Sequence, residues 1–351
     1  MSSAQISPIE QPTLGTTKFE LKKEFKWKKT FTGFPSEYLV ARDRVGEHFA
    51  TLRDGRKICY WKDGNDGVPV VCLHGGGESK WYFMQREPIP GVQLISIDRY
   101  GYGKTDHVPG QRISNYSWEE IISDMSEFLE VLGLKKVIWW GFSIGSSWAQ
   151  HLAVALSERT YGIIICGTMS DTFNTLMTSE ERGKIGAPPS ILNPQTGCLG
   201  CILRSAFVGL PKAIQKHDFT SAFDPDFKNK DAQNRFKKML EDDFWISSKI
   251  DGLLGNTRGE ALMGDAIRSL CSPWKHGPQE ITCPIYIFQA DHDEDMGSSS
   301  PTSPEFIKRV APNVIALEWL QGAGHSFTVG PDEECRGHVV KAVAAIVPFS
   351  S

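Results

Sequence analysis

Residues 136–156, KVIWWGFSIGSSWAQHLAVAL, decide the fold class of this chain. The apolar run 137–140 is typical of a strand buried in a parallel sheet, and a helix is expected over 146–156. Between them, Gly141, Ser143 and Gly145 match the pattern G-x-S-x-G. A strand that enters this turn and a helix that leaves it would hold the serine hydroxyl at the carboxyl edge of a sheet. The segment therefore predicts a nucleophilic serine, Ser143.

The segments around this turn alternate between strand and helix signals. Short apolar runs at 68–73, 94–97 and 162–166 indicate further buried strands, and Asp54-Gly55 indicates a hairpin turn between strands at 48–52 and 57–61. Ser117 and Glu120 form a capping box that opens a helix, which ends at Gly133. Alternation of this kind predicts an α/β fold with a mostly parallel central sheet flanked by helices.

The alternation breaks after residue 171 and returns near residue 283. The intervening stretch is rich in proline and charge, with helix candidates at 235–240 and 260–270. A strand at 284–289, another at 314–320 and a helix at 336–346 then resume the pattern. We therefore expect an α/β core of residues 46–171 and 283–351, interrupted by a mainly helical cap at 172–282.

The first 45 residues are expected to form a polar, irregular N-terminal extension. Its lysine-rich piece, residues 18–29, could lie on a membrane surface, but two glutamates interrupt the charge and its apolar side chains also fit an extension packed on the main domain. The second interpretation is preferred. The beginning of the chain shows no basic region followed by an apolar one, so no secretory signal is expected.

Composition excludes several classes of protein. With 351 residues, 40% hydrophobic and 23% charged, the chain can bury a large core, and its net charge of −4 argues against a nucleic-acid-binding surface. The apolar runs are much shorter than the ~20 residues of a membrane-spanning helix. Cys198 and Cys201 form a lone CxxC without a second pair at zinc spacing, so no metal is expected. A cytoplasmic location is the default expectation.

A serine nucleophile requires a base, an acid and an oxyanion site. His325, in a glycine-rich loop after the strand at 314–320, is the best candidate base. The acid candidates follow the strand at 284–289, in the order serine, acid, histidine; they are Asp291, Asp293, Glu294 and Asp295. His74-Gly-Gly-Gly77 follows another strand, so its Gly76 amide could bind an oxyanion together with the Ile144 amide. A phosphate loop is the rival interpretation, but the following Lys-Ser/Thr is absent.

These motifs together resemble the α/β-hydrolase superfamily, in particular its serine esterase and peptidase-like members. The likeness runs from about residue 47 to 347 and includes the loop 98–106, DRYGYGKTD. Counting along the acid strand as the family does places the acid at Asp293. Because Ala290 replaces the usual glycine there, Asp291 stays open, as does the more distant Asp171. A serine nucleophile disfavours the epoxide hydrolase and haloalkane dehalogenase branches, which need a carboxylate.

The resemblance implies a serine hydrolase that cleaves a carboxylic ester, thioester or lactone of a small, apolar substrate through an acyl-enzyme. No metal or organic cofactor is implied, and a monomer or weak homodimer is expected. One alternative is a prolyl-type aminopeptidase that holds an amine with cap carboxylates at 241–243, although the stretch from His74 to Glu78 lacks the proline of that family's corresponding loop. The other is a small-molecule receptor. Substrate contacts are expected from Gly75, Trp81, Phe142 and Trp245.

Overall fold

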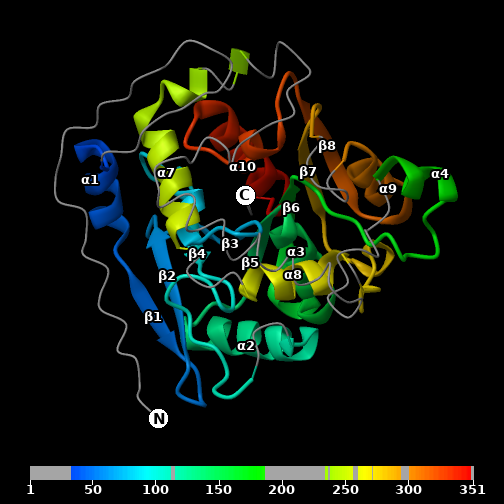
Figure 1. Cartoon of the computed structure of the whole chain (residues 1–351), viewed down its shortest axis with the longest axis horizontal. Coiled ribbons are helices and arrows are strands. Elements are labelled where there is room, and N and C mark those ends of the chain that lie inside the picture. The colour runs from blue at the N-terminus through cyan, green and yellow to red at the C-terminus, as the bar shows by residue number, and fades with distance from the viewer. Residues whose placement is uncertain are drawn as a thin grey trace, which may run out of the picture.

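A computed structural model describes residues 33–111, 115–185, 234–235, 238–255, 260–270, 272–293 and 300–348 (Figure 1). Within these residues, eight strands form one sheet in the order β1-β2-β4-β3-β5-β6-β7-β8. Strand β2 is antiparallel to β1 and β4, and the neighbours from β4 onward are parallel. The mostly parallel sheet confirms the predicted α/β class. The strands are β1 (His48–Thr51), β2 (Lys57–Asp63), β3 (Val68–Leu73), β4 (Val92–Ile97), β5 (Val137–Phe142), β6 (Thr160–Cys166), β7 (Ile285–Ala290) and β8 (Val314–Leu320).

Helices cover both faces of the sheet and enclose two apolar cores. One face packs against helices α1 (Ser36–Val45), α7 (Asp243–Leu254) and α10 (Glu333–Ile346). The other face packs against α2 (Trp118–Val131), α3 (Ile144–Ala155), α8 (Glu260–Leu270) and α9 (Thr302–Val310) (Figure 1). Neighbouring strand residues alternate between the cores, as Ile163 and Ile164 of β6 do, because side chains along a strand point to opposite faces. Both cores are fully enclosed, which explains the continuous apolar runs of these strands.

Local signals in the sequence placed most element starts correctly. The capping box forms as predicted: Ser117 accepts a hydrogen bond from the Glu120 amide, and the Glu120 carboxylate accepts one from the Ser117 amide. The β1–β2 hairpin turns at Asp54-Gly55, where Gly55 has a φ of +87° that favours glycine. Helix α8 coincides with the predicted helix at 260–270.

One expectation about helices was wrong. Residues 36–45 of the extension are not irregular but form α1, whose Tyr38, Ala41 and Val45 are buried. Helix α7 lies in the segment expected to be mainly helical, but its position is not evident from sequence, because residues 244–253 are all buried and no polar face reveals a helical period. Of the predicted helix at 235–240, residues 235 and 238–240 are helical. The lysine-rich piece at 18–29 and the CxxC lie outside the described residues.

The insertion expected at 172–282 leaves the core between neighbouring strands. Strands β6 and β7, on either side of it, pair directly, with Ile163 opposite Ile285. Its described parts include α4 (Ser179–Ile185), α7 and α8. The sheet is thus continuous across an interruption of more than a hundred residues, which is the arrangement an inserted cap requires. The exact division into core and cap stays a prediction.

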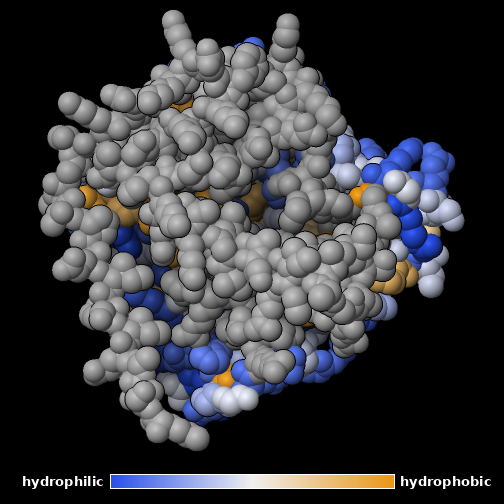
Figure 2. All heavy atoms as spheres, in the orientation of Figure 1, coloured by the Kyte–Doolittle hydropathy of each residue, from blue (hydrophilic) through white to orange (hydrophobic). Residues whose placement is uncertain are grey.

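Two further features of the fold concern the hydropathy of its surface and the length of its helices. In the view of Figure 2, hydrophilic side chains predominate over α4 and α9. None of the helices in the described part of the chain combines the length and apolar character needed to cross a bilayer.

Candidate active site

The turn between β5 and α3 has the strained geometry expected of a nucleophile elbow. Ser143 has φ 52° and ψ −124°, and it is the only residue other than glycine with positive φ in the described part of the chain. Its amide donates to the Cys166 carbonyl at 3.0 Å, which fixes the turn to the neighbouring strand β6. Gly141 and Gly145 have no room for side chains, since a Cβ on Gly145 would lie 1.9 Å from the Leu73 carbonyl oxygen. Close packing of the backbone therefore explains both glycines of G-x-S-x-G.

His325 and Asp293 lie against each other. His325 begins the 3-10 helix η7 (His325–Thr328), just beyond β8, and its Nδ1 lies 3.0 Å from both carboxylate oxygens of Asp293. The Asp293 side chain is fully buried and also accepts a hydrogen bond from Gln289 Nε2 at 2.5 Å. Gln289 is held in turn by the Thr168 amide, 2.8 Å from its Oε1. The role of Gln289 is not evident from sequence, because it reads as one more residue of a buried strand.

The other acid candidates make different contacts. Asp291 accepts hydrogen bonds from the amides of Gly322 and Ala323 at 3.0 and 3.1 Å, so it organises the loop that leads to His325. Asp171 accepts from the amides of Phe173 and Trp274. Asp293 is therefore the described candidate whose carboxylate contacts the His325 ring. Glu294 and Asp295 lie outside the described residues.

Phe142, the residue before Ser143, contacts the His325 ring. The Phe142 and His325 rings lie 4.8 Å apart between centroids. Both rings also border Gly167, where a Cβ would lie 2.7 Å from His325 Cε1 and 2.8 Å from Phe142 Cε2. The structure thus brings the loops that carry Ser143, His325 and Asp293 to the carboxyl ends of the parallel strands β5, β7 and β8. This is where an open α/β sheet places its ligand sites.

The loop after β3 reaches the same place. A Cβ on Gly76 would lie 2.8 Å from Cδ1 of Ile144 and 2.7 Å from Cδ1 of Leu262, so Gly76 lies beside the start of α3. Ile144 is the first residue of that helix, and its amide therefore has no acceptor within the helix. Within the described residues no hydrogen bond engages the Gly76 amide. The neighbouring Gly75 amide donates to the Glu78 carboxylate, and the Gly77 amide donates to the Tyr102 hydroxyl.

Of the four residues predicted to contact substrate, two are neighbours and the other two lie elsewhere in the fold. Gly75 and Phe142 are neighbours, because a Cβ on Gly75 would lie 3.1 Å from the Phe142 ring. Trp81 instead packs beneath the α1 residue Arg42, whose guanidinium carbon lies 4.5 Å from the ring centroid. Trp245 is buried on α7 and borders Gly330. Substrate contact stays a prediction for all four residues.

Other histidines are held in structural positions. His74 is fully buried, and its Nε2 accepts the Arg99 amide at 3.1 Å. Burial, followed by the Arg99 charge, holds the His74 pKa well below its usual range. His151 stacks on Trp118 with centroids 3.7 Å apart, and burial lowers its pKa to about 3. Both rings are therefore neutral at physiological pH.

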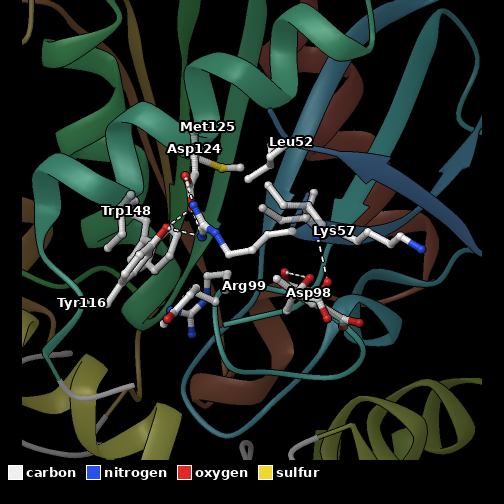
Figure 3. Close-up of a pocket in the computed structure, with 15 residues that line it drawn as sticks. Leu52, Lys57, Asp98, Arg99, Tyr116, Asp124, Met125 and Trp148 are labelled. Carbon is white, nitrogen blue, oxygen red and sulfur yellow. Dashed lines mark hydrogen bonds and ion pairs between the residues drawn. The ribbon is translucent and has the colours of Figure 1, made fainter. Parts of the chain in front are cut away.

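A small cavity lies elsewhere in the molecule, away from the candidate triad. It lies between the β1–β2 hairpin, α2 and the loop after β4, and has a volume of about 20 Å³ (Figure 3). Asp124, Met125 and Tyr116 form part of its wall, but Ser143, Asp293 and His325 do not. This volume suits a water molecule at most. The described residues also contain no group of three or more His, Cys, Asp or Glu side chains placed to hold a metal.

Comparison with known proteins identifies the family. The sequence profile described as the alpha/beta hydrolase family matches residues 70–336. The chain therefore belongs to the alpha/beta hydrolase family, which confirms the resemblance noted from its motifs.

Individual relatives share parts of the chain. A Bacillus subtilis (strain 168) protein assigned as a 2-succinyl-6-hydroxy-2,4-cyclohexadiene-1-carboxylate synthase is 35% identical over 136 residues, covering 38% of this chain and 48% of its own. The Homo sapiens (lyso)-N-acylphosphatidylethanolamine lipase is 25% identical over 186 residues, covering 51% and 50%. The chain thus spans about half the length of these curated relatives. A crystal structure of bromoperoxidase from Bacillus anthracis shares the fold, with a TM-score of 0.60, 19% identity, and coverage of 86% of this chain and 99% of that one.

Proposed function

We propose that the protein is a serine hydrolase that cleaves a carboxylic ester, thioester or lactone through an acyl-enzyme. The observation that carries the proposal is the contact of His325 with the buried Asp293 beside a strained Ser143, all at the carboxyl ends of parallel strands. A serine hydroxyl becomes nucleophilic only when a neighbouring base removes its proton. Membership in the alpha/beta hydrolase family supports the same chemistry.

Each residue of this triad has a defined role in the proposed reaction. Ser143 Oγ attacks the substrate carbonyl carbon while Nε2 of His325 takes the hydroxyl proton. Asp293 accepts the Nδ1–H of His325, orients the ring and stabilises its cation. When the tetrahedral intermediate collapses, His325 returns the proton to the leaving alcohol. Water then attacks the acyl-enzyme with the same histidine as base, which releases the acid and frees Ser143.

The oxyanion of the tetrahedral intermediate would be bound by the amides of Gly76 and Ile144. Both amides stand beside the Ser143 turn, and the Ile144 amide also lies at the positive end of α3. Donors that are fixed before the reaction need no reorganisation as charge develops on the carbonyl oxygen. No step in this scheme requires a cofactor.

The nature of the substrate is supported by the residues around Ser143. Phe142, Ile144 and Leu262 are buried apolar side chains that border the oxyanion loop. We therefore propose a small substrate with an apolar acyl or alcohol part. The relative named as a lipase is consistent with ester cleavage.

The aminopeptidase alternative is less well supported. Of the cap carboxylates at 241–243, Asp242 caps α7 by accepting the Trp245 amide at 3.0 Å and also pairs with Arg86. It therefore has a structural role at the start of α7.

The second alternative is a small-molecule receptor. A single-turnover burst without steady-state product release would indicate a receptor and not an enzyme.

The proposal is tested by labelling with a fluorophosphonate probe and by turnover of short p-nitrophenyl esters, with prolyl-naphthylamide as the competing substrate. Wild-type protein should be labelled and should cleave the esters, and Ser143→Ala should abolish both. Asp293→Asn should lower kcat on the order of 10⁴-fold, because the histidine loses its orienting anion. Asp291→Asn is the matched control, since this carboxylate contacts backbone amides and not His325. Labelling of the Ser143→Ala variant would rule out the assignment.

A further inference from the structure

Two buried ionisable side chains next to the candidate site have no role in the scheme above. Glu78, in the loop after β3, is 7% exposed, and Lys249, on α7, is 0% exposed. Glutamate and lysine are almost never buried so deeply unless their charges are compensated. Their burial, one in the loop after β3 and the other on α7, therefore calls for an explanation.

Glu78 fixes the oxyanion loop. Its Oε2 accepts a hydrogen bond from the Gly75 amide at 2.7 Å, and the Gly75 carbonyl accepts one from Arg99 Nη2 at 2.9 Å. Gly75 has no room for a side chain, because a Cβ there would lie 2.8 Å from Glu78 Oε2. Both polar groups of the Gly75 backbone are thus held, and the position of the neighbouring Gly76 amide depends on them.

Lys249 fixes the loop that carries His325. Its ammonium group donates a hydrogen bond to the carbonyl of Val329, the residue that follows η7. It also lies 3.3 Å from the centroid of the Tyr82 ring. Tyr82 stacks on Phe142 at 5.3 Å with an interplanar angle of 10°, and Phe142 contacts His325. A chain of ring contacts therefore joins Lys249 to the candidate base.

We propose that Glu78 and Lys249 are positioning residues: Glu78 holds the oxyanion loop through its bond to the Gly75 amide, and Lys249 ties the His325 loop to helix α7. The inference rests on the proposed hydrolase function, and it adds that α7, which lies within the inserted segment, is needed to align the His325 loop. Neither residue takes part in bond formation or cleavage.

The charge of the pair responds to pH near neutrality. Burial raises the pKa of Glu78 to about 7, against the charges of Lys249, His325 and Arg99, which favour its ionised form. Burial likewise lowers the pKa of Lys249 to about 7, against Glu78, Cys335, Asp332 and Cys166. The ionised Glu78 is the stronger acceptor for the Gly75 amide. Loss of its charge should therefore reduce activity at low pH.

The two residues should shift the pH dependence in opposite directions. In Lys249→Met, Glu78 loses a favourable charge and ionises less readily, so the acidic limb of the kcat/KM profile should move up by about one pH unit. In Glu78→Gln, no carboxylate titrates and His325 loses a neighbouring anion, so the limb should move down. Both variants should lower kcat about 10- to 100-fold on a p-nitrophenyl ester, with little change in KM.

The matched control is Asp251→Asn. Asp251 is also buried on α7, but its carboxylate faces Tyr38 and Arg42 on α1. Its removal should leave the acidic limb in place, and Glu78→Asp should restore part of the wild-type profile. If Glu78→Gln does not fold, the Lys249→Met profile decides alone, and an acidic limb that does not move up would overturn the proposal. Unshifted limbs, or a failure of both variants to fold, would overturn the proposal.

The experiment separates this inference from the proposed function. If Ser143→Ala still reacts with the fluorophosphonate probe, the hydrolase assignment fails. If Ser143→Ala abolishes labelling but the limbs of the Glu78 and Lys249 variants coincide with wild type, only the positioning role fails.

Discussion

At the scale of single residues, the Ser143 turn depends on the absence of two Cβ atoms. Gly145 packs directly on the backbone of the neighbouring strand, with the Leu73 and His74 carbonyl oxygens 1.9 and 2.7 Å from an added Cβ. Backbone atoms cannot move aside as a flexible side chain can. The sharp turn and the close packing of α3 on β3 are therefore parts of one arrangement.

Gly145→Ala is consequently expected to destabilise the protein by about 3 kcal/mol or more, because the added methyl group must push α3 away from β3. The free energy of unfolding in urea, followed by circular dichroism, measures this. Gly183→Ala is the matched control. An added Cβ on Gly183 has no neighbour within 4 Å, and alanine favours helix α4, so this variant should be stabilised by up to about 1 kcal/mol. Equal effects of the two substitutions would contradict the packing argument.

At the scale of elements, α1 secures α7. Tyr38 donates its hydroxyl to the buried Asp251 carboxylate at 2.9 Å, and Arg42 lies 3.4 Å from the same group. The Tyr38 ring also packs on Phe244 at 5.3 Å. Since α7 in turn carries Lys249, the helix before the first strand supports the candidate site from a distance.

Tyr38→Phe should therefore lower stability by about 1–3 kcal/mol, because Asp251 stays buried with one hydrogen bond fewer. Urea unfolding again provides the measurement. Val40→Ala, on the same helix but 68% exposed, should change stability by no more than about 0.5 kcal/mol. A Tyr38→Phe variant as stable as Val40→Ala would show that α1 does not secure α7 through this bond.

At the scale of the whole molecule, one sheet separates two cores of similar size. Ile163 belongs to the core beneath α2 and α3, and its neighbour Ile164 belongs to the core beneath α7 and α10. Both side chains are fully buried. The sheet is therefore covered on both faces.

Ile163→Ala and Ile164→Ala should accordingly each cost about 2–5 kcal/mol, the usual range for a buried large-to-small change. Ile315→Ala is the control, since Ile315 lies on β8 but is 45% exposed and should lose about 0.5 kcal/mol or less. Thermal unfolding followed at two wavelengths tests whether the cores melt together. A large loss for only one of the two buried positions would indicate that one face contributes little.

The sequence by itself determined the fold class and the candidate nucleophile and base, Ser143 and His325. The sequence signals that located these features are local: they are the apolar runs, the Ser117 capping box and the glycines around Ser143. Each depends only on a few neighbouring residues. Family resemblance pointed to Asp293, and the structure adds that its carboxylate, not that of Asp291, contacts His325.

Only the tertiary structure decided what lies around that triad. Helix α7 is buried on all sides and so lacks an amphipathic pattern, and Gln289 reads as an ordinary strand residue. Glu78 and Lys249 are 171 positions apart, so the sequence could not show that both are buried beside one site. Burial and charge compensation are properties of residues brought together by folding, and they give these side chains their meaning.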